Sequence, residues 1–234
     1  MSLGDSPSAD RRQWRPVDTL KALGWWFLAG ILAYAVVLPG EVSTAELFGL
    51  VVPLQSVGAI ASVVWMARTR QPWREALAVR IAWADWVGLL IGGALQIGLA
   101  YLLVVIVESV FHGSLPNQEV VDAASVAVGS VDKVLVAVSL IVIGPVAEEL
   151  LFRGVLLRAL LVGHSARFAV MVSAIAFAAL HLLDPAAWAV APLLAILGVV
   201  MGSEVVRTGR LGRSITIHAG FNLVTVVALL TVSN

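Results

Sequence analysis

Long apolar runs alternate with short polar segments along almost the whole chain. A transmembrane helix needs about 20 mainly apolar residues, and seven runs approach that length. The fifth is short enough to be tilted, kinked or joined to its neighbour. We therefore predict an all-α fold, a polytopic transmembrane bundle of about seven spanning helices. The predicted spans are 22–39, 44–67, 86–111, 134–161, 168–184, 186–206 and 215–233.

The connecting segments are brief, which predicts one compact domain. Residues 1–21 form a polar N-terminal tail, and residues 22–234 are predicted to be a single transmembrane domain. The longest interruption, 113–133, carries apolar residues at helical spacing and predicts a weakly amphipathic helix on the membrane surface. The tail lacks the arrangement of a signal peptide, so we interpret the first apolar run as a retained helix.

Composition supports this membrane class. Hydrophobic residues make up 60% of the chain and charged residues 13%, with a mean hydropathy of +0.96. Soluble domains carry about 25% charged residues. The formal net charge is zero, so no nucleic-acid partner is indicated. The chain has no cysteine, which excludes disulfides, thiol catalysis and cysteine-bound metal.

Basic residues gather in alternate connections, and this bias sets the orientation of membrane helices. Thirteen of the fifteen fall on one side of a seven-helix bundle, whereas Lys133 lies on the other side and Arg153 lies inside a span. The bias predicts a cytoplasmic N-terminus and an outward C-terminus, with the cell (plasma) membrane as location. The thirteen are Arg11, Arg12, Arg15, Lys21, Arg68, Arg70, Arg74, Arg80, Arg158, Arg167, Arg207, Arg210 and Arg213.

Two adjacent glutamates, Glu148 and Glu149, lie inside the fourth apolar run, and Arg153 follows one turn later. A charged side chain at the bilayer centre costs about 2.5–3.5 kcal/mol, so such a group indicates a functional site. Glu149 and Arg153 share a helix face and should pair. Glu148 is rotated by about 100°, so it can face a cavity and act as a general base. The alternative is a structural ion pair beside a spectator acid.

Two further apolar runs each carry a histidine that lies four residues from another residue of interest. His181 follows Phe177 by four residues, and His218 precedes Asn222 by four, so each pair shares a face. A single histidine in an apolar helix is more often an interhelical hydrogen-bonding group than a catalytic one. Their occurrence together with Glu148, Glu149 and Arg153 favours a shared site. Solvation at a segment end accounts better for His112 and His164, and Glu108 is expected to pair with His112 or to extend to the interface.

These three motifs resemble those of the CAAX-protease and bacteriocin-processing (CPBP) family of intramembrane proteases, which includes the Ras-converting endopeptidase. The motifs are Glu148-Glu149-x-x-x-Arg153, Phe177-x-x-x-His181 and His218-x-x-x-Asn222. The resemblance covers residues 131–234, a CPBP-like catalytic core. It implies that Glu148, Glu149, Arg153, His181, His218 and Asn222 form the catalytic site.

The resemblance implies peptide-bond hydrolysis in the membrane and leaves two mechanisms open. In the first, Glu148 and His181 activate water while His218 and Asn222 stabilise the oxyanion. In the second, His181, His218 and Glu148 bind zinc, and Glu148 acts on the metal-bound water. The chain lacks the His-Glu-x-x-His motif of soluble zinc proteases, and we favour the first mechanism.

The predicted function is an intramembrane endopeptidase acting on a membrane-associated or lipidated peptide or protein, with membrane lipid as its surroundings. Two other classes stay open: a non-catalytic scaffold or immunity-type protein, and a small proton-coupled transporter. A transporter would more naturally show two related halves with broken helices, whereas the intramembrane charges here are confined to the C-terminal half. Neither the substrate nor its prenylation follows from the sequence.

Overall fold

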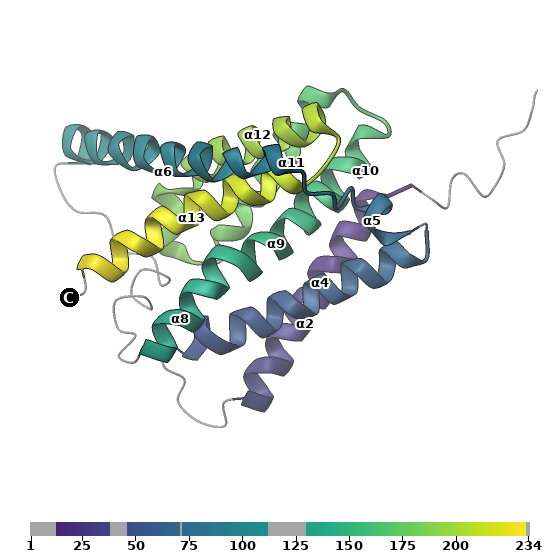
Figure 1. Ribbon diagram of the computed structural model, residues 1–234, viewed down its shortest axis with the longest axis horizontal. Helices are drawn as coiled ribbons and strands as arrows, with labels where there is room; N and C mark the ends of the chain where they lie inside the picture. Colours follow the sequence, from purple (N-terminus) through teal and green to yellow (C-terminus); the bar gives the residue numbers. More distant parts are fainter. Residues whose placement is uncertain (1–12, 38–45, 71, 112–129, 233–234) are drawn as a thin grey trace, which may run out of the picture.

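The computed structural model describes residues 13–37, 46–70, 72–111 and 130–232, and these residues are mainly helical, with no strand among them (Figure 1). The all-α fold is therefore confirmed. The first half contains α2 (Pro16–Val37), η1 (Leu47–Val51), α4 (Val52–Arg68), α5 (Trp73–Ala76), η2 (Trp83–Trp86), α6 (Val87–Ile106) and η3 (Val107–Phe111). The second contains α8 (Ser130–Val138), η4 (Ser139–Ile143), α9 (Gly144–Glu149), η5 (Leu150–Leu156), α10 (Leu157–Leu161), α11 (Ala166–His181), η6 (Pro185–Ala189), α12 (Ala191–Thr208) and α13 (Gly212–Val232).

Four of these helical stretches are long and apolar enough to cross a membrane: Gly49–Arg68, Trp83–Ser109, Lys133–Leu161 and Ala191–Thr208. The chain is thus an integral membrane protein. α11 is a shorter apolar helix, as the short fifth run predicts. α2 and α13 cover most of the predicted first and seventh spans. The count of seven spans stays a prediction, and most of the predicted surface helix at 113–133 lies outside the described residues.

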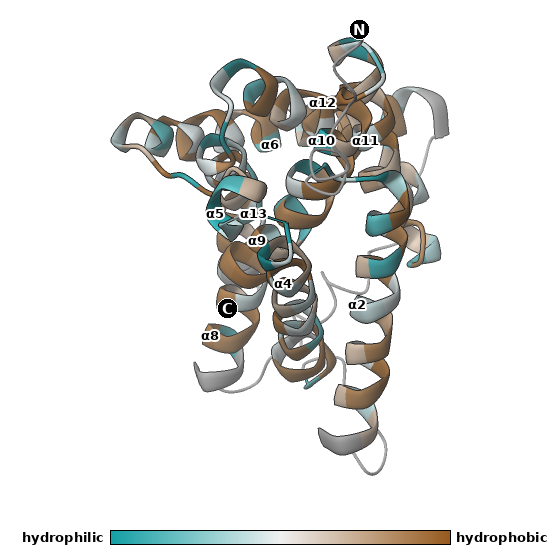
Figure 2. Cartoon of the chain, turned by 90° about the vertical axis from the view of Figure 1, so that its right-hand side faces the viewer, coloured by the Kyte–Doolittle hydropathy of each residue, from teal (hydrophilic) through white to brown (hydrophobic). Residues whose placement is uncertain are grey.

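The outer surface of the bundle is apolar, which is the reverse of a soluble protein. Along α6, the side chains of Leu90, Ile97 and Tyr101 are each more than 60% exposed. The hydrophobic colour covers most of the long helices in Figure 2. Helices can present such surfaces to lipid because their backbone hydrogen bonds are satisfied internally.

Glycines allow α6 and α13 to pack closely along each other (Figure 1). A Cβ atom at Gly92 of α6 would lie 2.7 Å from the Phe221 backbone nitrogen, and one at Gly220 of α13 would lie 2.7 Å from the Leu89 Cα. Small residues at such positions are the usual means of close helix approach in membranes. This contact holds α13, which carries His218, against the bundle.

The stretch from α8 to α10 is one continuous helix that widens twice into π-helical turns, η4 and η5. In η4 the Gly144 N–H bonds to the Ser139 carbonyl, five residues back. The corresponding donor for the Leu140 carbonyl would be Pro145, which has no N–H. The sequence therefore leaves the Leu140 carbonyl, eight residues before Glu148, without its π-helical donor. Such π-turns often occur at functional sites.

Candidate active site

A buried ion pair between Glu149 and Arg153 forms the centre of the predicted site. Arg153 Nη1 lies 2.8 Å from Glu149 Oε1, and neither side chain is exposed. The (i, i+4) spacing places them together as the sequence predicts. Arg153 also donates from Nη2 to the Gly198 carbonyl of α12 at 3.2 Å, and its guanidinium carbon lies 4.6 Å from the centre of the Phe177 ring on α11. Arg153 thus ties η5 to two other helices.

Glu149 has two further partners, both on α13. His218 Nδ1 lies 3.1 Å from Glu149 Oε1, and the Ser214 hydroxyl donates to Oε2. Because an ionised carboxylate only accepts hydrogen bonds, Nδ1 of His218 carries a proton. The remaining ring nitrogen, Nε2, is left to face Glu148. Glu149 is therefore both the counter-ion of Arg153 and the group that orients His218.

Glu148 faces a different direction from its neighbour. Its side chain is 19% exposed, whereas that of Glu149 is fully buried, and its Oε2 lies 3.7 Å from His218 Nε2. This distance is longer than a hydrogen bond and leaves Glu148 without a close cationic partner among the described side chains. Glu148 is therefore the more accessible of the two glutamates, beside the His218 imidazole.

His181 joins the cluster through the Phe177 ring rather than through a direct contact with a glutamate. Its Nδ1 lies 3.0 Å from the Phe177 carbonyl, so Nδ1 is the donor and Nε2 is free to accept. The His181 and His218 rings lie edge-on to Phe177, with centroid distances of 4.9 and 5.5 Å. The contacts of both histidines with one ring bring them to the same region.

Asn222 lies one turn beyond His218, but its amide points to the backbone of η4. Its Nδ2 donates to the Leu140 carbonyl at 2.7 Å, the group that Pro145 leaves without a helical donor. An amide carries two N–H groups, so the second remains for another acceptor. Asn222 therefore fastens α13 to the helix of the glutamates, a contact that the sequence motifs do not predict.

The described residues contain no group of three histidine, aspartate or glutamate side chains placed to bind a metal ion. Glu148 Oε2 and His218 Nε2 lie 3.7 Å apart, whereas His181 makes its ring contact with Phe177. As they are arranged, these residues do not fit a zinc site with three protein ligands.

Sequence reasoning missed Ser214 and Gly198. The Ser214 hydroxyl donates to Glu149, and the Gly198 carbonyl accepts from Arg153. Ser214 precedes His218 by four residues on α13 and is fully buried, so the spacing could have identified it. The role of the Gly198 carbonyl as acceptor for Arg153 depends on tertiary packing, which sequence spacing does not show. Of the other polar residues, His164 stacks on Phe168 at an exposed turn, Glu108 is exposed in η3, and His112 lies outside the described residues.

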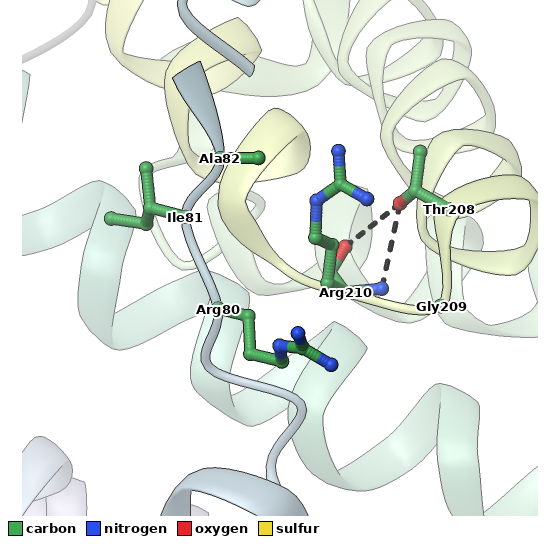
Figure 3. A pocket seen from close by; sticks show the side chains of 6 residues that line it. All are labelled: Arg80, Ile81, Ala82, Thr208, Gly209 and Arg210. Atoms are coloured by element: carbon green, nitrogen blue, oxygen red, sulfur yellow. Dashed lines mark hydrogen bonds between the residues drawn. The ribbon is translucent and has the colours of Figure 1, made fainter. Parts of the chain in front are cut away.

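A cavity of about 190 Å³ lies away from this cluster, at the turn between α12 and α13. Figure 3 shows the hydroxyl of Thr208 bridging the backbone of Arg210 there, with Arg80 on the opposite wall. Asp85 is buried beside it and binds Arg210 through two hydrogen bonds of 3.0 and 2.8 Å. No residue of the glutamate cluster lines this cavity, so we interpret it as part of the membrane-surface structure.

Replacing Gly198 with valine is expected to destabilise the protein by about 1–3 kcal/mol, the usual cost of overpacking. A Cβ atom at this position would lie 2.9 Å from the Ala174 Cα and 3.2 Å from Arg153 Nη2. The substitution would push α11 and α12 apart and disturb the Arg153 contact. The measurement is unfolding in detergent, with Gly24→Val as control because its Cβ would meet nothing within 4 Å. Equal stability of both variants would contradict the close packing.

Comparison with known protein families gives a match in the second half of the chain. Residues 130–224 match the family described as Type II CAAX prenyl endopeptidase Rce1-like. The matched range, somewhat less than half of the chain, contains all three motifs and every residue of the cluster, so the predicted family resemblance is confirmed there. No curated protein and no solved structure gives a significant match. The match indicates a protease or hydrolase of the CAAX-protease type.

Proposed function

We propose that the protein is an intramembrane endopeptidase that hydrolyses a peptide bond in a membrane-associated or lipidated substrate, with Glu148 as the general base. The observation that carries the proposal is the difference in environment between the two adjacent glutamates. Glu149 is buried and bound to Arg153, Ser214 and His218, whereas Glu148 is partly exposed beside His218 Nε2. The Rce1-like match over this region supports the reaction class.

In the proposed reaction, Glu148 takes a proton from a water molecule while the water oxygen attacks the scissile carbonyl carbon. Nε2 of His181, which is a free acceptor, orients the second hydrogen of that water. The tetrahedral intermediate then collapses, the C–N bond breaks, and the proton held by Glu148 passes to the leaving amine. The products are a carboxylic acid and an amine, which become a carboxylate and an ammonium group when the acid proton passes to the amine, so the step needs no reactant other than water.

His218 and the second N–H of Asn222 are proposed to stabilise the oxyanion of the intermediate. Nε2 of His218 would donate to the oxyanion, and the Nδ1 contact with the Glu149 carboxylate fixes the orientation of the ring. Glu149 and Arg153 then act through His218, by holding its ring in place. These two residues are therefore proposed as positioning groups.

The test is a proteolysis assay with the purified protein in detergent or bilayers, using quenched-fluorescence peptides with and without a prenyl group. We expect hydrolysis that is lost in Glu148→Ala and kept in the presence of a metal chelator. Loss of activity with chelator and its recovery with zinc would replace the proposed mechanism with the metal-dependent one. No hydrolysis of any membrane peptide by the folded wild type would favour the scaffold or transporter classes.

Access to the site is predicted to open toward the cytoplasm. Arg158 lies ten residues beyond Glu148, about 15 Å of helix, and His218 lies five residues beyond Arg213, so basic loops mark the nearer surface. A single cysteine at Asn222 should react with a membrane-impermeant reagent from the cytoplasmic side only. Arg207→Cys and Lys133→Cys serve as references for the two sides, and labelling of position 222 from the outside alone would contradict the prediction.

A further inference from the structure

A second cavity, of about 220 Å³, lies between α2 and α4, far from the glutamate cluster in the sequence. It is located where α2 begins and α4 ends, and the two helices run side by side from that end (Figure 1). Its walls combine charged and aromatic side chains. They are Asp18, Lys21, Trp25, Trp65, Met66, Thr69 and Arg70.

The charged groups of this cavity form an ion-pair cluster around Asp18, in which Arg70 is held in place and Lys21 is exposed. Asp18 is buried and lies 2.9 Å from Arg70 Nη2. Arg70 also donates to the Met66 carbonyl at 2.7 Å and lies over the Trp14 ring at 4.3 Å, so its guanidinium is held in place. Lys21 Nζ is 3.8 Å from Asp18, beyond hydrogen-bond distance, and its side chain is 60% exposed. Two cations and one carboxylate leave one net positive charge.

The aromatic groups are placed as in the interfacial belts of membrane proteins. Trp25 and Trp65 are 51% and 63% exposed, one on each helix. Tryptophan prefers the headgroup level, where its ring is in contact with the hydrocarbon and its N–H with polar groups. Further along the same two helices the exposed side chains are mainly apolar. They include Leu28, Ile31 and Leu32 on α2 and Leu54 and Val57 on α4.

We propose that this cavity binds the headgroup of a phospholipid with one net negative charge. Its phosphate oxygens accept hydrogen bonds from Lys21 and Arg70. Trp25 and Trp65 flank the glycerol and ester region, and the acyl chains lie along the aliphatic faces of α2 and α4. The single net positive charge matches one phosphodiester, which favours an anionic lipid over a zwitterionic one. The proposal does not depend on peptide hydrolysis.

The test measures lipid binding to the purified, full-length protein in mild detergent by native mass spectrometry. The probes are phosphatidylglycerol, phosphatidylcholine and inorganic phosphate. The wild type should bind phosphatidylglycerol more tightly than phosphatidylcholine, and inorganic phosphate should not displace it. Lys21→Gln should weaken phosphatidylglycerol binding about fivefold, the effect of roughly one lysine at an anionic surface. Trp65→Leu should weaken the binding of both lipids.

Arg80→Gln is the matched control, because Arg80 is also an exposed basic residue but lines the other cavity. It should leave phosphatidylglycerol binding unchanged. An equal loss in Arg80→Gln and Lys21→Gln would show general surface attraction and overturn the site. Unchanged binding in Lys21→Gln, or equal affinity for the two lipids, would also overturn it. Displacement by inorganic phosphate at similar concentration would identify a free anion site instead.

Discussion

Glu148→Gln is expected to lower the turnover of a cleavable membrane peptide by about 10²–10⁴-fold, the usual contribution of a general base. An amide of the same size cannot take the proton of the attacking water. The variant should fold like the wild type because Glu148 is partly exposed and has only a 3.7 Å contact with His218. The measurement is kcat with a quenched-fluorescence peptide, together with unfolding in detergent.

Glu108→Gln provides the control for this substitution, since Glu108 is an exposed glutamate in the apolar stretch of α6 and η3 and contacts no residue of the cluster. It should leave both kcat and stability unchanged. Turnover by Glu148→Gln within a few fold of the wild type would contradict the assignment of the base. A parallel loss of stability in that variant would show that Glu148 is structural.

The spanning helices could be predicted because lipid exposure imposes a simple requirement. A helix in a bilayer needs about 20 apolar residues, and the runs that meet it include the stretch observed as Lys133–Leu161. The ends of the helices were less predictable. α2 begins at Pro16, six residues before the predicted span, because polar residues such as Asp18 cap and anchor its first turn: the Asp18 side chain accepts from the Arg15 N–H at 2.9 Å.

The contacts within one helix of the site could also be predicted, whereas the contacts between helices could not. Four-residue spacing gives the Glu149–Arg153 pair, and it persists although η5 is wound as a π-helix. The bond from Asn222 to the Leu140 carbonyl requires knowledge of both the π-turn and the docking of α13. The sequence shows Pro145, which cannot donate to the Leu140 carbonyl, but it does not show that Asn222 supplies the missing hydrogen bond.

Glu149 connects more of the site than its role as a counter-ion suggests. Its carboxylate contacts Arg153 on its own helix and both Ser214 and His218 on α13. Arg153 in turn reaches α12 through the Gly198 carbonyl. The orientation of His218 beside Glu148 therefore depends on a network whose members are buried. A buried network of this kind stabilises the fold only while all of its members are present.

Glu149→Gln is accordingly expected to destabilise the protein by about 3–5 kcal/mol, the cost of breaking a buried ion pair by removing one partner. Arg153 would keep its charge with no exposed surface and would lose the ionised carboxylate that lies 2.8 Å from its Nη1. The variant should unfold at a lower denaturant concentration than the wild type in mixed micelles, and it should accumulate poorly in cells. Turnover should fall as well, because the amide holds His218 less firmly.

Two further variants separate the loss of charge from the loss of one hydrogen bond. Ser214→Ala removes one donor to Glu149 and keeps the ion pair, so it should cost only about 0.5–1.5 kcal/mol. The double variant Glu149→Gln/Arg153→Gln removes both charges and should be more stable than the sum of the two single effects predicts. If Glu149→Gln unfolded at the same denaturant concentration as Glu148→Gln, the two glutamates would be energetically equivalent. In that case the division between a buried positioning group and a partly exposed base would be wrong.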